Sequence, residues 1–95
     1  MDLTMMLTIS TAHIRPETAE MLEMEDATGD MGLTVYALGE GYESNGWLVY
    51  VDTEAYGDVP EDLQRLMEFC AGKGIDWLRL DGDGEILPEL PTYEW

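Results

Sequence analysis

The apolar residues of this chain follow two different periods, and the way those periods alternate restricts the fold more than any other feature. Met5, Leu7 and Ile9 stand at every second position, which is typical of a half-buried strand. Between residues 63 and 70 the apolar positions have the spacing of an amphipathic helix. The patterns predict strands at residues 4–12, 33–38, 47–51 and 77–80, and helices at about 16–25 and 60–72.

Local signals support both helices and one hairpin. Pro16 suits a first helical turn because it has no N–H to leave unpaired, and Glu17 stands near the positive end of the helix dipole. Asp58, with Glu61 three residues later, is a variant of the capping box before the second helix. An Asn-Gly pair at 45–46 closes a Gly-rich loop and predicts a hairpin between the second and third strands.

These elements predict a single α+β domain over residues 1–95, in the order strand, helix, strand, strand, helix, strand. Residues 85–87 are a candidate for a short fifth strand at an edge. We expect a sheet of four to five strands with both helices on one face and with some parallel pairs. A ferredoxin-like arrangement fits this order, and other α+β arrangements remain open. The predicted core residues are Leu7, Ile9, Val35, Val49, Leu63, Leu66, Leu78 and Leu80.

Three aromatic residues fall on the strand positions opposite to the core. If helices cover one face of the sheet, then Tyr36, Tyr50 and Trp77 share the other face. An exposed aromatic face is typical of a docking surface. The tail at 88–95 holds two prolines and several large apolar residues, and we expect it to fold over this face instead.

The charge of the chain is extreme. It holds 21 acidic residues against four basic ones, Arg15, Arg65, Lys73 and Arg79, for a formal net charge of -17. Self-repulsion on this scale destabilises a compact state. Four scattered cations do not form a basic patch, and an anionic membrane surface repels the chain. We therefore expect a basic protein as the partner, with no direct contact to nucleic acid or membrane; the oligomeric state stays open.

Acidic residues gather in the first predicted helix and in the loop after it. Glu17, Glu20 and Glu23 follow one another at i+3 with no lysine between them, although like charges at that spacing cost about 0.2–0.5 kcal/mol each. The predicted partner-binding residues are Glu17, Glu20, Glu23, Glu25, Asp26 and Asp30, with Glu40 and Glu43 as a second patch. Seventeen charges correspond to about 29 Å of duplex DNA, close to the ~30 Å diameter of such a domain. The carboxylates are therefore expected to stand in for phosphates.

Few residues suggest chemistry. Asp81, Asp83 and Glu85 offer oxygen ligands for a divalent cation, but they lack the EF-hand pattern, and Asp-Gly-Asp-Gly is ordinary turn chemistry. His13 is the single histidine and has no nucleophile paired with it in sequence, so we expect it to bond local backbone groups. Cys70 is expected to be a buried thiol. We predict no enzyme, no catalytic residue, no metal and no cofactor.

The compartment follows from what the chain lacks. No apolar run approaches the ~20 residues that span a bilayer, and the start Met1-Asp2-Leu3-Thr4 has no basic leader. We expect a cytoplasmic protein. A halophilic source would also produce many acids and few lysines, but the seven Met, the three Trp and the excess of Glu over Asp disfavour it.

Three segments resemble a known family: LTISTAHIRPETAEML at 7–22, GWLVYV at 46–51, and the stretch from VPEDL to LPTYEW at 59–95. The most specific parts are STAHI at 10–14, WLRLDGDGE at 77–85 and LPTYEW at 90–95. They are similar to a domain-of-unknown-function family of short acidic bacterial proteins carried on plasmids, prophages and other mobile elements. The resemblance implies no activity. It implies a context in which small proteins act on host defence or on toxin partners.

The expected function is that of a small acidic binding protein. Our first hypothesis is a DNA mimic that inhibits a basic, nucleic-acid-handling host defence protein. One alternative is an interaction module that does not mimic DNA, for example the partner of a basic toxin. A further alternative is a divalent-metal-dependent enzyme that uses Asp81 and Asp83.

Overall fold

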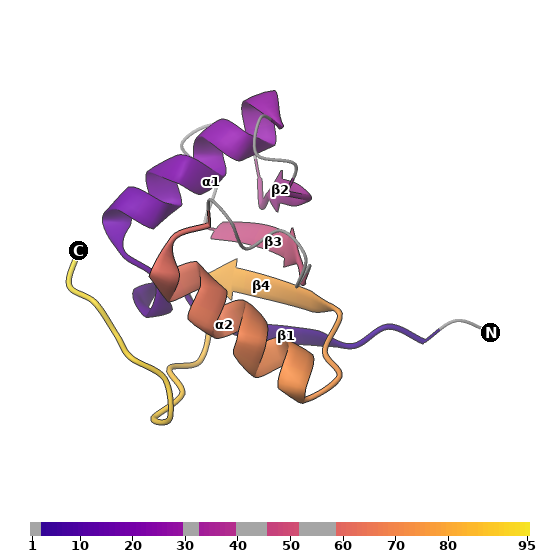
Figure 1. Ribbon diagram of the computed structural model, residues 1–95. Helices are drawn as coiled ribbons and strands as arrows, with labels where there is room; N and C mark the ends of the chain where they lie inside the picture. The colour runs from indigo at the N-terminus through magenta and orange to yellow at the C-terminus, as the bar shows by residue number, and fades with distance from the viewer. Residues whose placement is uncertain (1–2, 30–32, 40–45, 52–58) are drawn as a thin grey trace.

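The computed structural model describes residues 3–29, 33–39, 46–51 and 59–95 (Figure 1). Its elements follow the predicted order. They are β1 (Met6–Ser10), the short 3-10 helix η1 (Thr11–His13), α1 (Pro16–Thr28), β2 (Val35–Ala37), β3 (Gly46–Tyr50), α2 (Glu61–Gly72) and β4 (Trp77–Asp81). The α+β class is confirmed. Among the described residues, no helix has both the length and the apolar character needed to cross a membrane.

The strands form one mixed sheet in the order β1-β4-β3-β2. β1 pairs with β4 in parallel, as expected of some pairs, while the β4–β3 and β3–β2 pairs are antiparallel. α1 therefore joins two parallel strands, β1 and β2, whereas α2 joins the antiparallel neighbours β3 and β4. The ferredoxin-like pattern is matched in the order of its elements, but only α1 makes the split βαβ connection that the pattern requires.

The suggested fifth strand is reduced to a single bridge. The N–H of Ser10 donates to the carbonyl of Glu85 over 2.9 Å, and Ile9 and Glu85 form an isolated parallel bridge. Gly84 allows this approach, because a Cβ at that position would lie 2.5 Å from the carbonyl carbon of Ile9. Beyond Glu85 the chain leaves the sheet, since the N–H of Leu87 bonds to a side chain instead of a strand.

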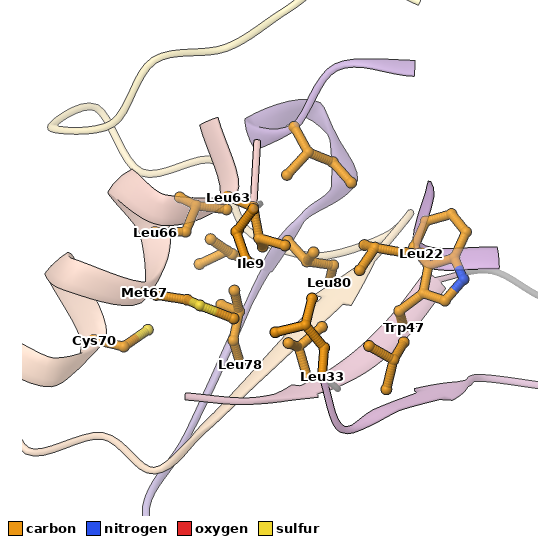
Figure 2. Close-up of a cluster of buried hydrophobic side chains, with 14 of the residues drawn as sticks. Ile9, Leu22, Leu33, Trp47, Leu63, Leu66, Met67, Cys70, Leu78 and Leu80 are labelled. Atoms are coloured by element: carbon orange, nitrogen blue, oxygen red, sulfur yellow. The ribbon is translucent and has the colours of Figure 1, made fainter. Parts of the chain in front are cut away.

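Both helices pack against the same face of the sheet. Figure 2 shows side chains of both helices and of the strands pointing into one cluster, with Leu22 from α1 and Leu66 and Met67 from α2. Burying each such side chain contributes about 1.5–3 kcal/mol. Every predicted core residue is buried except Leu7, which is half-buried.

α1 extends beyond its predicted end near residue 25. Gly29 ends the helix in the left-handed conformation, at φ 67°, and its N–H bonds to the carbonyl of Glu25 over 2.9 Å. Glycine favours such a stop because it has no Cβ. α2 begins after Pro60 without a side-chain cap, and Asp58, its predicted cap, lies outside the described residues.

Candidate functional site

The outer surface of α1 carries two acids that contact no cation among the described residues. Glu17 and Glu20 are both exposed, and neither ion pair in the described part of the chain involves α1. The helix sequence PETAEMLEMEDAT contains no lysine or arginine. The predicted acidic face is therefore present at the N-terminal half of α1, where negative charge also suits the helix dipole.

The later acids of α1 hold the helix to the sheet. The indole Nε1–H of Trp47 donates to Glu23 over 3.0 Å, and the N–H of Leu33 donates to Glu25 over 2.8 Å. The N–H of Ala37 donates to Asp26 over 3.1 Å. These bonds join α1 to β3, to the residues before β2, and to β2.

Burial separates the predicted binding residues that a partner can reach from one that it cannot reach. Glu25 is only 4% exposed, so its carboxylate is removed from any surface that a partner can touch. Glu23 and Asp26 are exposed, although one carboxylate oxygen of each accepts a hydrogen bond, from the indole of Trp47 and from the N–H of Ala37 respectively. Asp30, Glu40 and Glu43 lie outside the described residues.

Every cation of the chain is held by an intramolecular contact. The four pairs are Arg15 with Tyr93, Arg65 with Glu61, Lys73 with Phe69, and Arg79 with Asp81. Two are ion pairs with N–O distances of 3.4 and 3.2 Å, and two place the cation 4.9 and 5.1 Å from a ring centroid. Arg65 lies on α2, Lys73 at its C-cap and Arg79 on β4, whereas Arg15 is the N-cap of α1 and stands over Tyr93 of the tail. No cation lies within α1 itself.

The face of the sheet opposite the helices carries the predicted aromatic cluster. Trp77 lies 5.1 Å from Tyr50 in an edge-to-face arrangement and 6.4 Å from Tyr36, measured between ring centroids. Tyr36 is 56% exposed and Tyr50 is 41% exposed. The expectation that the tail covers this face is wrong, because the tail bonds elsewhere.

The tail packs along η1 and the start of α1. The N–H of Tyr93 donates to the carbonyl of Ala12 over 2.8 Å, and the indole of Trp95 donates to the carbonyl of Ile14 over 3.0 Å. Leu90 is buried in the core. The tail therefore covers an edge of the core near residues 12–14, and it leaves the aromatic cluster uncovered.

His13 holds this tail from the inside. The ring is 1% exposed. Its Nε2 accepts from the N–H of Leu87 over 3.0 Å, so the proton of the neutral ring is on Nδ1, which donates to the carbonyl of Pro91 over 2.7 Å. Both nitrogens bond to backbone groups, as the sequence predicted, although these groups are distant along the chain instead of local. The ring has no nitrogen left for catalysis.

Asp62 is a buried acid whose role the sequence did not reveal. Its carboxylate accepts from the N–H of Arg15 over 2.8 Å and from the hydroxyl of Thr18 over 2.8 and 2.7 Å, and the residue is 2% exposed. The acid stands in the first turn of α2 and contacts the first turn of α1, so the positive ends of both dipoles stabilise it. In the sequence, the position of Asp62 at a predicted helix start was the signal for a structural role. Its contact with α1 depends on how the two helices pack together.

The Asp81 turn uses its oxygens internally. One carboxylate oxygen of Asp81 accepts from the N–H of Asp83 over 2.9 Å, and the other pairs with Arg79. Within the described ranges, no three His, Cys, Asp or Glu side chains are grouped so as to hold a metal ion.

Cys70 is buried in the core as expected, and burial raises the pKa of its thiol to about 11. The thiol is therefore protonated at neutral pH and a poor nucleophile.

Comparison with known proteins is informative on the family only. No curated protein and no solved structure matches the chain. The family model of the C-terminal domain of DUF5983, a family of unknown function, matches residues 6–95. The expected membership of a domain-of-unknown-function family is confirmed, and this chain belongs to the DUF5983 family.

Proposed function

We propose that this protein is a non-enzymatic, cytoplasmic binding protein that engages a basic, nucleic-acid-handling protein by presenting carboxylates in place of phosphates. The observation that carries the proposal is the separation of charge. α1 itself holds no Lys or Arg, and Arg15 at its N-cap stands over Tyr93, while Glu17, Glu20 and Glu23 lie exposed on the helix.

The spacing of these acids supports the proposal. Positions three apart on a helix are about 4.5 Å apart along its axis, which is of the same order as the ~3.4 Å rise along the duplex axis between successive phosphates of one DNA strand. The principal extents of the molecule are 34 × 30 × 29 Å. A net charge of -17 over that length is comparable to the charge of duplex DNA.

The small energy of single surface ion pairs also favours binding by several acids together. Surface ion pairs contribute only about 0–1 kcal/mol each, so a partner has to contact several carboxylates at once. The like-charged i+3 spacing lowers the stability of the free helix. Joint binding of these acids to a basic surface would offset that cost.

The aromatic sheet face favours a second candidate function. Tyr36 and Tyr50 leave large apolar surfaces in water, which negative charge alone does not explain. A binding module that does not mimic nucleic acid, such as the partner of a basic toxin, would use those surfaces.

Capture with competition tests the mimic. The protein is immobilised and exposed to nuclease-treated lysate of the organism that encodes it, at low and at high salt. We expect a basic protein that is retained at low salt, released at high salt, and displaced by duplex DNA. Retention that duplex DNA does not disturb would contradict mimicry and favour the second candidate. If no basic protein were retained at any salt concentration, the proposal of a basic partner would fail.

A further inference from the structure

One complete face of the sheet has no covering layer within the described part of the chain. Strand pairing aligns Tyr36, Leu48, Arg79 and Thr8 in one row across the sheet, and Tyr50, Trp77 and Met6 in the next. The opposite face packs against both helices. We call the uncovered surface formed by these seven residues the open face.

The apolar part of the open face is exposed and preorganised. Met6 is 52% exposed, in addition to the two tyrosines described above. The rings of Tyr36 and Tyr50 both pack against Trp77, so little side-chain freedom remains to be lost on binding. A few residues carry most of the binding energy in protein interfaces and are enriched in Trp and Tyr, and a preorganised cluster loses less entropy on binding.

The charge of the chain selects among possible occupants. A second copy brings another -17 to the interface, and a net charge that far from zero keeps a protein monomeric. Nucleic acid stacks readily on Tyr and Trp, but its phosphates are repelled by the same field. A basic partner is attracted by it.

We propose that the open face is the apolar anchor for the basic partner, and that the partner segment bound there alternates basic and apolar side chains. The inference rests on the proposed function, from which it takes the positive charge of the partner. The acids then accelerate the encounter, while the aromatic cluster slows dissociation.

The chemistry of the open face suits cationic side chains as well as apolar ones. A guanidinium or ammonium group binds over the face of an aromatic ring, and this chain already uses that contact for Arg15 on Tyr93 and Lys73 on Phe69. Arg79, the cation within the open face, is paired with Asp81, so it opposes a basic partner only weakly.

Two defined peptides test the anchor. One alternates Arg with Leu, and the other has the same number of Arg alternating with Gly. Charge alone would give the two peptides equal affinity. We expect the Arg-Leu peptide to bind about tenfold more tightly, the effect of one good apolar contact. The combined Tyr36→Thr and Tyr50→Thr variant, which keeps residues suited to strands, is expected to abolish that difference. Ile86→Thr, which removes an exposed apolar side chain outside the open face, is the matched control and should leave the difference intact.

The three tryptophans report separately where each peptide binds. The indole N–H of Trp47 bonds to Glu23 on α1, that of Trp95 bonds near η1, and Trp77 stands on the open face. In a ¹H–¹⁵N correlation spectrum, the Arg-Leu peptide should shift the Trp77 indole signal most. This measurement uses the unmodified protein, so it stands even if the double variant folds poorly.

The possible outcomes distinguish binding at the open face from binding by charge alone. Equal affinities for the two peptides, or a shift confined to Trp47, would overturn the anchor and leave the acidic binding protein in place. Failure of both peptides to bind at low salt would overturn the proposed function together with the anchor. A Trp77 shift that depends on protein concentration without peptide would assign the open face to a second copy, and a shift with oligo-dT would assign it to nucleic acid; either result would contradict our inference.

Discussion

At the scale of single residues, buried polar groups decide how the two helices meet. Asp62 is an acid in a chain crowded with acids, yet it is buried and accepts from two groups at the start of α1. Its negative charge is stabilised by these hydrogen bonds and by two helix N-termini. The same type of residue thus serves the core at position 62 and the surface at positions 17 and 20.

We expect Asp62→Ala to lower the free energy of unfolding by about 3 kcal/mol, because it leaves the N–H of Arg15 and the hydroxyl of Thr18 without their acceptor. Asp62→Asn keeps one oxygen acceptor and should cost roughly half as much. Urea unfolding measures both. Glu61→Ala, in the same turn but exposed, is the control and should change stability by less than about 1 kcal/mol. Equal losses at the two positions would contradict the role of Asp62.

Cys70 gives stability a defined dependence on alkaline pH. Burial raises the pKa of its thiol to about 11 in the folded protein, whereas the unfolded thiol loses its proton near the ordinary value of ~8.5. Deprotonation therefore favours the unfolded chain first, and stability should fall as the pH rises between these values. Chemical denaturation at a series of pH values, with Cys70→Ala for comparison, checks this. A fall of the same slope in the variant would show that Cys70 is not the cause.

At the scale of elements, the tail is an integral part of the fold. His13 bonds to Leu87 and Pro91, which lie 74 and 78 residues further along the chain. The backbone N–H of Tyr93 and the indole N–H of Trp95 each donate to a backbone carbonyl at or just after η1. A segment without helix or strand is thereby fixed in place by four hydrogen bonds.

Replacing His13 should release the tail. His13→Ala leaves the N–H of Leu87 without an acceptor and opens a cavity, which together cost about 2–4 kcal/mol. We also expect proteolytic cleavage after residue 87 to accelerate, which mass spectrometry of a limited digest would show. Thr92→Ala, an exposed change within the tail, should have neither effect. A stable, protease-resistant His13→Ala variant would mean that the apolar contacts of Leu90 hold the tail without the histidine.

At the scale of the whole molecule, the exposed acids and the exposed aromatic residues lie on opposite sides of the sheet. The helices and their acids cover one face, and the aromatic residues occupy the other. Electrostatic attraction acts over a Debye length of about 8 Å at physiological salt, so acids that lie outside the area of contact also increase the rate of encounter.

Removing charge from α1 should weaken binding while changing stability little. Glu17→Gln, Glu20→Gln and Glu23→Gln together remove two i+3 repulsions, about 0.4–1 kcal/mol at low salt, but also the favourable interaction of Glu17 with the helix dipole, about 0.3–1 kcal/mol, so the stability of the free protein should change by less than about 1 kcal/mol. The Gln at position 23 retains an oxygen for the indole of Trp47. The association rate with the Arg-Leu peptide should fall, and the loss should diminish as salt is added.

The matched control removes equal charge elsewhere. Glu68, Glu89 and Glu94 are exposed on α2 and in the tail, and their combined change to Gln should reduce the association rate less. If both triple variants lost the same rate, net charge rather than the α1 surface would govern the encounter. A loss of clearly more than about 1 kcal/mol in the α1 variant would contradict our account of the helix electrostatics.

Much of the fold could be predicted from local patterns. Alternating apolar residues located β1, apolar strand-like segments located β3 and β4, and Pro16 marked the start of α1. These features depend on contacts between near neighbours in the chain, so the local sequence is sufficient. The fifth strand was uncertain because a three-residue segment carries too short a pattern.

The sequence by itself determined the net charge, the opposite faces of the strands and the absence of cations from α1. The tertiary structure decided which acids remain at the surface, because the bonds of Glu25 to Leu33 and of Asp62 to Arg15 depend on how separate elements pack. It also decided that the tail lies along His13 rather than over Trp77, since Nε2 and Nδ1 of one buried ring bind two points of the tail. Composition cannot reveal these outcomes, because a carboxylate or an imidazole has the same chemistry in either place until packing supplies its partner.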